Sequence, residues 1–473
     1  MRLQSTPVRY RLAAALYLFL VYAVGVFSKS AWSDDYSSLL DPKASAIHII
    51  RDGRPIYGEV LQFVFEYFNN VQSLVFIRLI GVIGLILLND LLIKNLLARR
   101  FDVGVVVASC VAFTLPSFQF SAHWAQAFGP IWAPYLAVLG YTLTLCSSKL
   151  KRILGLLLFV ISLLIYPLLS FFVFPYIYAV WFVEDLPFAA LFKNLRAGFF
   201  LIASSSVISF VVSYTYLRLN GLEFNDRVGI ITFGTIPTKL VFFLTRPFAT
   251  TYRPFFIDSP TAISLLLEFS FFFVAVALLL WRKFGVLSSV ILHLIVLNLF
   301  FILSLLPLLV TTENQIDMRL VCSNTWLFCF VVVSLLLKPK AASLGIRELS
   351  KNRFRFFMMA FLLTLGFYSI NQNFQILFHN PYQTKQAFFE KQFESCTASQ
   401  IKSGVVITRR TLPWPHKNLI GAYSQSTDFE SDWVPVGAVV QFLKDASLVS
   451  DSLPILGVPG ENLSACEINL DEY

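Results

Sequence analysis

Long apolar runs constrain the fold of this chain more than any other feature. Runs of about 16 to 22 mostly apolar residues recur along the chain, and a helix needs this length to cross a hydrocarbon core of about 30 Å. Hydrophobic residues make up 57% of the chain and charged residues 14%, whereas soluble domains are about a quarter charged. The sequence therefore predicts an all-α polytopic membrane protein, and this composition excludes a soluble enzyme.

The basic residues follow the topology of such a protein. A net charge of +9 would by itself suggest nucleic acid as a partner. Lys and Arg instead cluster in short loops at alternate ends of the apolar runs, as the positive-inside rule predicts for cytoplasmic loops. Arg2, Arg9 and Arg11 hold the N-terminus in the cytoplasm by this rule, and about eleven transmembrane helices then place the C-terminus outside. We expect membrane lipids as partners, and no nucleic acid.

We predict spans at about residues 12–27, 73–93, 103–115, 131–145, 153–166, 168–182, 197–217 and 356–370, with two more flanking Arg282 and Lys283 and another ending at Lys338. Spans 153–166 and 168–182 form a short pair hinged at Pro167, which two re-entrant halves would fit equally well. The first outer loop, residues 28–72, is unusually long. Its charged residues interrupt amphipathic segments that are suited to a bilayer surface.

Residues 371–473 have a different composition, because charged residues, Gln, Asn, Ser and Pro return there. Runs at 404–408 and 434–443 are typical of a small mixed α/β unit. We therefore divide the chain into a transmembrane domain, 1–370, and an extracytoplasmic C-terminal α/β domain, 371–473, on the outer face beside loop 28–72. Cys396 and Cys466 are the cysteines of this domain, and an oxidising compartment favours a disulfide between them. The alternative is two unrelated buried thiols.

An acidic motif lies in the first outer loop. The residues Trp32-Ser33-Asp34-Asp35-Tyr36 follow the first span, and Asp52-Gly53-Arg54-Pro55 comes later in the same loop. A carboxylate can take a proton from a sugar hydroxyl, and an arginine can hold a phosphate in its two-pronged fork. The structural alternative is that Ser33, Asp34 or Asp35 caps a short helix that begins near Tyr36.

This pattern, followed by a hydrophobic second span, resembles the first outer loop of membrane glycosyltransferases of the GT-C class. More narrowly, it resembles the serotype-converting glucosyltransferases that decorate bacterial O-antigen, the glucosyl transferase II family. The resemblance extends to the spans, to Arg319 at the entry of a late span and to the outward C-terminal domain. It implies an enzyme of a bacterial inner membrane, with a polyprenyl-phosphate-linked sugar as donor and a lipid-linked or surface glycan as acceptor. It also implies that an acidic residue, Asp34 or Asp35, acts at the acceptor hydroxyl.

Three arginines are candidates for the donor phosphate. Arg54 is the first, because its fork suits oxyanions and it shares a loop with the acids. Arg319 is the second, and its alternative is an ion pair with Asp317 or Glu313. Arg78, in the second span, either faces a cavity or extends outward to the interface.

The outer segment 116–134 supplies candidate sugar-binding residues. His123, Trp124 and Gln126 offer rings and an amide that suit sugar hydroxyls and apolar faces, although an interfacial aromatic belt explains the tryptophan equally well. Because a phosphate is a good leaving group, no general acid is required, and we expect no required cofactor. Asp34 and Asp35 leave room for a divalent cation without demanding one. The runner-up functions are a transporter or flippase of lipid-linked sugars, and an O-antigen polymerase.

Overall fold

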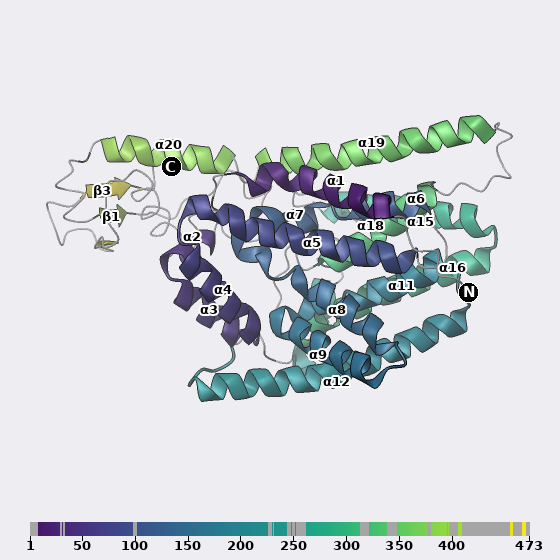
Figure 1. Cartoon of the computed structure of the whole chain (residues 1–473), viewed down its shortest axis with the longest axis horizontal. Coiled ribbons are helices and arrows are strands. Elements are labelled where there is room, and N and C mark those ends of the chain that lie inside the picture. Colours follow the sequence, from purple (N-terminus) through teal and green to yellow (C-terminus); the bar gives the residue numbers. More distant parts are fainter. Residues whose placement is uncertain are drawn as a thin grey trace.

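The computed structural model describes residues 8–28, 31, 34–97, 102–225, 229, 231–243, 247, 251, 262–312, 321–337, 348–375, 380–394, 396, 405–408, 455–456 and 466–469. Most of its helices run along the long axis of an elongated bundle, and the strands lie at one end beside α20 (Figure 1).

The elements occur in the following order: α1 (Val8–Val26), α2 (Asp34–Leu40), α3 (Pro42–Arg51), α4 (Pro55–Tyr67), η1 (Val71–Ser73), α5 (Leu74–Leu96), α6 (Val103–Ala112), α7 (Pro116–His123), η2 (Ala125–Phe128), α8 (Trp132–Thr144), α9 (Lys149–Ile165), α10 (Pro167–Ser170), α11 (Val173–Val183), α12 (Phe188–Leu219), η4 (Phe233–Thr235), α13 (Ile236–Phe243), α15 (Ala262–Phe284), α16 (Leu287–Ser304), α17 (Leu306–Val310), α18 (Cys322–Leu337), α19 (Glu348–Phe374), α20 (Asn380–Glu394), β1 (Val405–Thr408), β2 (Ile455–Leu456) and β3 (Cys466–Asn469).

The predicted spans fall on helices. The run at 73–93 forms α5, the run at 197–217 forms the longer α12, and the hinged pair forms α9 followed by α10 and α11, with Pro167 as the first residue of α10. Among the residues that the structure describes, five helices are long and apolar enough to cross a membrane: Val8–Val26, Val71–Leu96, Phe188–Leu219, Leu287–Ser304 and Arg353–Asn373. By the length and composition of its helices, the chain is a membrane-embedded helical protein. The number of crossings stays a prediction.

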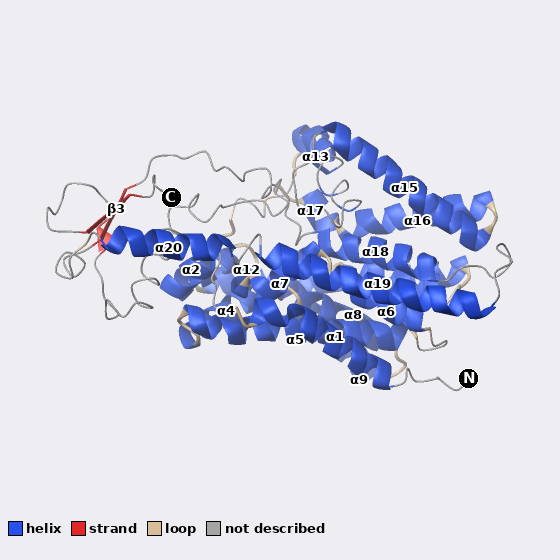
Figure 2. Ribbon diagram, turned by 90° about the horizontal axis from the view of Figure 1, so that it is seen from above, coloured by secondary structure: helices blue, strands red, loops and turns tan. Residues whose placement is uncertain are grey.

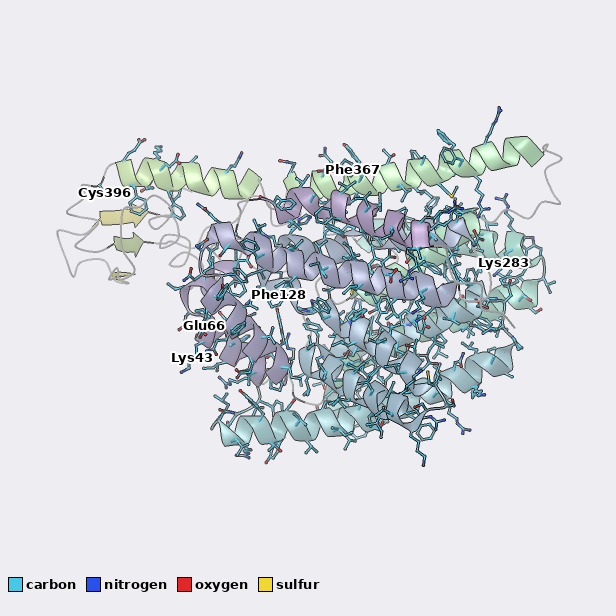
Figure 3. The ribbon with its side chains drawn as sticks, in the orientation of Figure 1. Lys43, Glu66, Phe128, Lys283, Phe367 and Cys396 are labelled. Carbon is cyan, nitrogen blue, oxygen red and sulfur yellow. The ribbon has the colours of Figure 1, made fainter. Side chains whose placement is uncertain are left out.

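Ion pairs join residues at the helix ends that we predict to be cytoplasmic. Arg11 of α1 donates a hydrogen bond to Asp90 of α5 at 2.6 Å. Arg355 of α19 pairs with Asp102, which also caps α6 by accepting the Gly104 N–H at 2.8 Å. Each pair fixes two helices against each other. Figure 3 shows Lys283, at the end of α15, at the opposite end of the bundle from Lys43 and Glu66.

The segment predicted as the first outer loop contains α2 and then a helical hairpin, α3 and α4, with the Asp52-Gly53-Arg54-Pro55 motif as its turn. Asp41 caps α3 by accepting the Ala44 N–H at 2.8 Å. A proline is the first residue of each helix, where its missing N–H costs no hydrogen bond. Gly53 has a φ of +78°, in the left-handed region that glycine tolerates. The short run Gly-Arg-Pro is therefore the stop of one helix and the start of the next.

The end of α12 holds this turn. Ser213 donates to the Gly53 carbonyl at 3.1 Å, and the Asn225 N–H donates to the Arg51 carbonyl at 2.9 Å. A hydroxyl of α12, Tyr216, also donates to Glu59 of α4. The outer loop is thus fixed to a helix that begins more than a hundred residues later in the sequence.

A second hydrophobic cluster, separate from the main core, joins the outer loop to the C-terminal region. Its buried members include Tyr36 and Leu39 of α2, Tyr57 and Phe65 of α4, and Phe389 and Phe393 of α20. Helix α20 therefore packs beside the acidic loop, where we expected the C-terminal region to lie (Figure 2).

The strands form a parallel sheet in the order β2-β1-β3, with Val405 opposite both Ile455 and Cys466. The predicted run at 404–408 thus contains a strand, whereas 434–443 lies outside the described residues. Helix α20 and this sheet are the described parts of the predicted α/β domain. The domain as a whole stays a prediction.

Candidate functional site

The carboxylate of Asp35 connects two distant segments of the chain. Asp35 is the second residue of α2 and is fully buried. It accepts the N–H of Gln126 at 2.7 Å and that of Ala125 at 3.4 Å. These are the first residues of η2, and Trp124, which precedes η2, supplies no side-chain cap. Asp35 therefore caps the N-terminus of η2, where a negative charge is favourable.

This contact separates the two acids of the motif. We expected a capping role, if any, to serve a helix that begins near Tyr36. Asp35 instead caps a segment that is 90 residues away in the sequence. Asp34 is the first residue of α2, and its side chain lies outside the described part of the chain.

Gln126 gathers three elements around this cap. Its side-chain amide donates to the Ser38 hydroxyl of α2 at 3.1 Å. The backbone carbonyl of Gln126 accepts a hydrogen bond from the hydroxyl of Tyr57, on α4. Because Tyr57 lies one turn after Arg54, Gln126 connects the acidic helix to the helix that Arg54 begins. A partly exposed amide at this junction suits a sugar hydroxyl better than the buried rings of His123 and Trp124.

Arg78 is fully buried and braces the same region from the other side. It donates to the carbonyl of His123 at 2.9 Å and to the carbonyl of Ser28 at 2.7 Å. These carbonyls lie at the C-terminal end of α7 and just beyond α1, where a cation complements the helix dipole. Arg78 thus binds backbone, and the outward extension that we considered from the sequence is wrong.

His123 packs its ring against α1. A Cβ at Gly25 would lie 1.8 Å from His123 Nδ1, so only glycine leaves room for the ring. The Tyr22 ring lies 6.0 Å from it, centroid to centroid. Burial, with a smaller contribution from the Arg78 charge, lowers the pKa of His123 to about 3. The imidazole is therefore neutral at physiological pH and holds α7 against α1.

Arg54 lies in a second group of polar residues at the turn of the hairpin. It donates to Asp52, and its guanidinium lies 4.9 Å from the centre of the Tyr166 ring. Asn225 donates to the other Asp52 oxygen at 2.7 Å. Burial opposes the ionisation of Asp52, but Arg54 and the Asn225 hydrogen bond lower its pKa below the usual value. Burial likewise opposes the charge of Arg54, and Asp52 raises the pKa of Arg54 in turn.

Of the other residues that we predicted, namely Arg319, the cysteines and the residues that could bind a metal, the structure describes only some. Arg319 lies outside the described residues. Cys396 is disulfide-bonded, and Cys110, Cys146, Cys322 and Cys329 are free. Cys466 is the first residue of β3, and its pairing with Cys396 stays a prediction. Among the described residues, no group of three or more His, Cys, Asp or Glu side chains could hold a metal ion.

Three of the residues that organise the site were not predicted. Ser38, Tyr57 and Asn225 are common polar residues, and nothing in their local sequence distinguishes them. Their partners lie 88, 69 and 173 residues away along the chain. Only the path of the backbone in space identifies them.

The comparisons with known proteins leave the function to be argued from this geometry. No model of a known protein family matches the chain, and no curated protein matches it at a significant level.

Proposed function

We propose that this chain is an integral-membrane glycosyltransferase of a bacterial inner membrane. It moves a sugar, with glucose as the first candidate, from a polyprenyl phosphate to a cell-surface glycan such as O-antigen on the outer face. The N-terminus is cytoplasmic, the C-terminal domain is periplasmic, and about eleven helices cross the membrane. One observation carries the proposal: Asp35 and Gln126 bring the acidic start of α2, the polar segment after α7 and the helix that Arg54 begins to one place.

The acids of loop 28–72 divide by what their side chains contact. The described carboxylates all have structural partners: Asp35 binds η2, Asp41 caps α3, Asp52 binds Arg54, Glu59 accepts from Tyr216 and Glu66 accepts from Gln62. Of the two acids in the motif, Asp35 already holds the N-terminus of η2 through two backbone N–H groups. We therefore propose Asp34 as the general base, and Asp35 as the residue that holds α2 beside η2.

The chemistry is a single displacement. The acceptor oxygen forms a bond to the anomeric carbon of the donor sugar while its proton passes to the Asp34 carboxylate. The bond from that carbon to the phosphate oxygen breaks, and its electron pair leaves with the lipid phosphate. Arg54 stabilises the phosphate charge, because one of its N–H groups binds Asp52 and the fork has further donors. No metal or other cofactor is required for these steps.

A transfer assay tests the proposal. Purified protein in proteoliposomes is given polyprenyl phosphate with a labelled sugar, together with a lipid-linked or lipopolysaccharide acceptor. The wild type should label the acceptor. The substitution Asp34→Asn should lower turnover by about 100- to 10,000-fold, the usual contribution of a general base.

The matched control is Asp41→Asn, an exposed acid of the same loop that caps α3. It should leave both the stability and the rate near those of the wild type, because Asn caps a helix about as well as Asp. Equal rates for Asp34→Asn and Asp41→Asn would overturn the role of Asp34. If labelled lipid crosses the bilayer and no sugar is transferred to the acceptor, the protein is a flippase and the proposed enzyme activity is wrong.

A further inference from the structure

The first turn of α18 carries four consecutive polar or indole side chains inside the bundle: Ser323, Asn324, Thr325 and Trp326. All four are buried. Such a run is unusual in an apolar helix, because burying a polar group without a hydrogen bond costs free energy. Each of the four buried side chains therefore needs either a hydrogen-bond partner or a function that explains its burial.

Two of the four hold α18 to its neighbours. The Asn324 oxygen accepts from Ser304 of α16, and its amide donates to the Phe301 carbonyl at 3.3 Å. The Thr325 hydroxyl lies 2.7 Å from the hydroxyl of Ser117, on α7. Hydrogen bonds of this kind between helices are common inside membranes and explain these two residues.

The other two have no such explanation. Among the residues that the structure describes, neither Ser323 Oγ nor Trp326 Nε1 has a hydrogen-bond partner. They are three residues apart, so they share one face of α18. Ser205 and Ser334 also have a buried hydroxyl without a partner in the described part of the chain, but each is a single group. The start of α18 presents two such donors on one face.

The surroundings define the kind of ligand that these donors suit. The Trp326 ring lies 5.0 Å from Phe172 and 6.2 Å from Phe113, centroid to centroid. The polar side chains that bind the same turn, Ser117 and Ser304, are neutral. Neutral donors among aromatic rings suit the hydroxyl and ring oxygens of a carbohydrate. They lack the charge that a phosphate or carboxylate group would need.

The first turn of α18 contacts α7, and so the candidate catalytic site, through Thr325, which lies on another face than Ser323 and Trp326. Ser117, which contacts Thr325, lies near the start of α7, and His123 ends it immediately before the segment that Asp35 caps. Ser117 and His123 are therefore about 9 Å apart along the helix. A donor whose phosphate lies at the candidate catalytic site could extend its sugar toward the first turn of α18.

We infer that Ser323 and Trp326 form a carbohydrate subsite that recognises hydroxyl groups of the donor sugar. This inference rests on the proposed function for the identity of the ligand. On this inference, the first turn of α18 determines which donor sugar is accepted, and the acidic loop does not.

An equilibrium binding measurement tests the subsite without requiring turnover. Polyprenyl phosphates that carry glucose, galactose or mannose, and the same lipid phosphate without a sugar, are titrated against the purified full-length protein in nanodiscs. The wild type should bind at least one glycosylated lipid more tightly than the bare lipid phosphate. Ser323→Ala and Trp326→Phe should each reduce this ratio of dissociation constants by about three- to tenfold, the loss of one hydrogen bond.

Ser334→Ala is the matched control, because it removes an equally buried hydroxyl without a partner from the same helix. It should leave the ratio unchanged. The subsite is overturned if no sugar increases the affinity of the wild type, or if Ser323→Ala behaves like Ser334→Ala, as it would if the turn held only a trapped water. A normal sugar dependence without any transfer would instead refute the proposed reaction and leave the subsite in place.

Discussion

At the scale of single residues, Asp52 shows how a buried acid is kept ionised. Arg54 and Asn225 bind its two oxygens and offset the cost of burial, so the pKa of Asp52 in the folded chain is lowered. In the unfolded chain its pKa should be near 3.9. A lowered pKa means that Asp52 stabilises the fold fully above about pH 4, and that this contribution is lost as the pH falls further.

Asp52→Asn should therefore be less stable than the wild type at pH 7, and the difference in unfolding temperature should narrow as the pH falls from about 4 to 3. Thermal unfolding of the detergent-solubilised protein, followed by tryptophan fluorescence, measures this. Glu66→Gln is the control, because that carboxylate is exposed and its hydrogen bond within the described part of the chain comes from its helical neighbour Gln62. An undiminished difference at pH 3 would show that Asp52 does not act through its charge.

At the scale of elements, α8 and α9 pack through two glycines. A Cβ on Gly140 would lie 2.7 Å from the Gly155 carbonyl oxygen, and a Cβ on Gly155 would lie 2.5 Å from that of Gly140. The obstacle in each direction is backbone, which cannot rotate away as a side chain could. Small residues allow such close approach of helices in membranes.

Gly155→Ala should consequently destabilise the protein by about 1 to 3 kcal/mol, the usual cost of overpacking. The unfolding temperature in detergent is the measurement. Gly234→Ala is its control, since a Cβ there meets no atom within 4 Å. Equal unfolding temperatures for the two variants would mean that α8 and α9 separate at little cost.

The positions of the elements were more predictable than the contacts between them. Apolar runs placed α5 and α6 within a few residues, because membrane-length helices are encoded by local composition. The start of α12 was predicted too late, because Lys193 and Arg196 interrupt its apolar run although both are good helix formers. The bond from Asp35 to η2 could not be predicted, because hydropathy does not encode which loops meet.

At the scale of the whole molecule, the two ends of the bundle differ in kind. Arg11 pairs with Asp90 and Arg355 pairs with Asp102 at one end, and the hairpin, α12 and α20 meet at the other. If the first end is cytoplasmic, a reporter that works only outside the cytoplasm should be active when fused after residue 40 or Tyr473. Fused after Arg100 or Lys340, it should be silent. Silence at Tyr473, with the fusion protein present in the membrane, would contradict a C-terminus outside the cytoplasm.

The cluster that Phe389 and Phe393 share with α2 and α4 has a consequence for how the protein is made. The acidic loop is synthesised well before the helix that completes its apolar packing, because that helix follows α19. Until α20 has been made, the apolar side chains of α2 and α4 in this cluster stay partly uncovered. Chains that stop before α20 would contain every residue of the proposed base and phosphate site, yet would lack the packing that holds α2 in position.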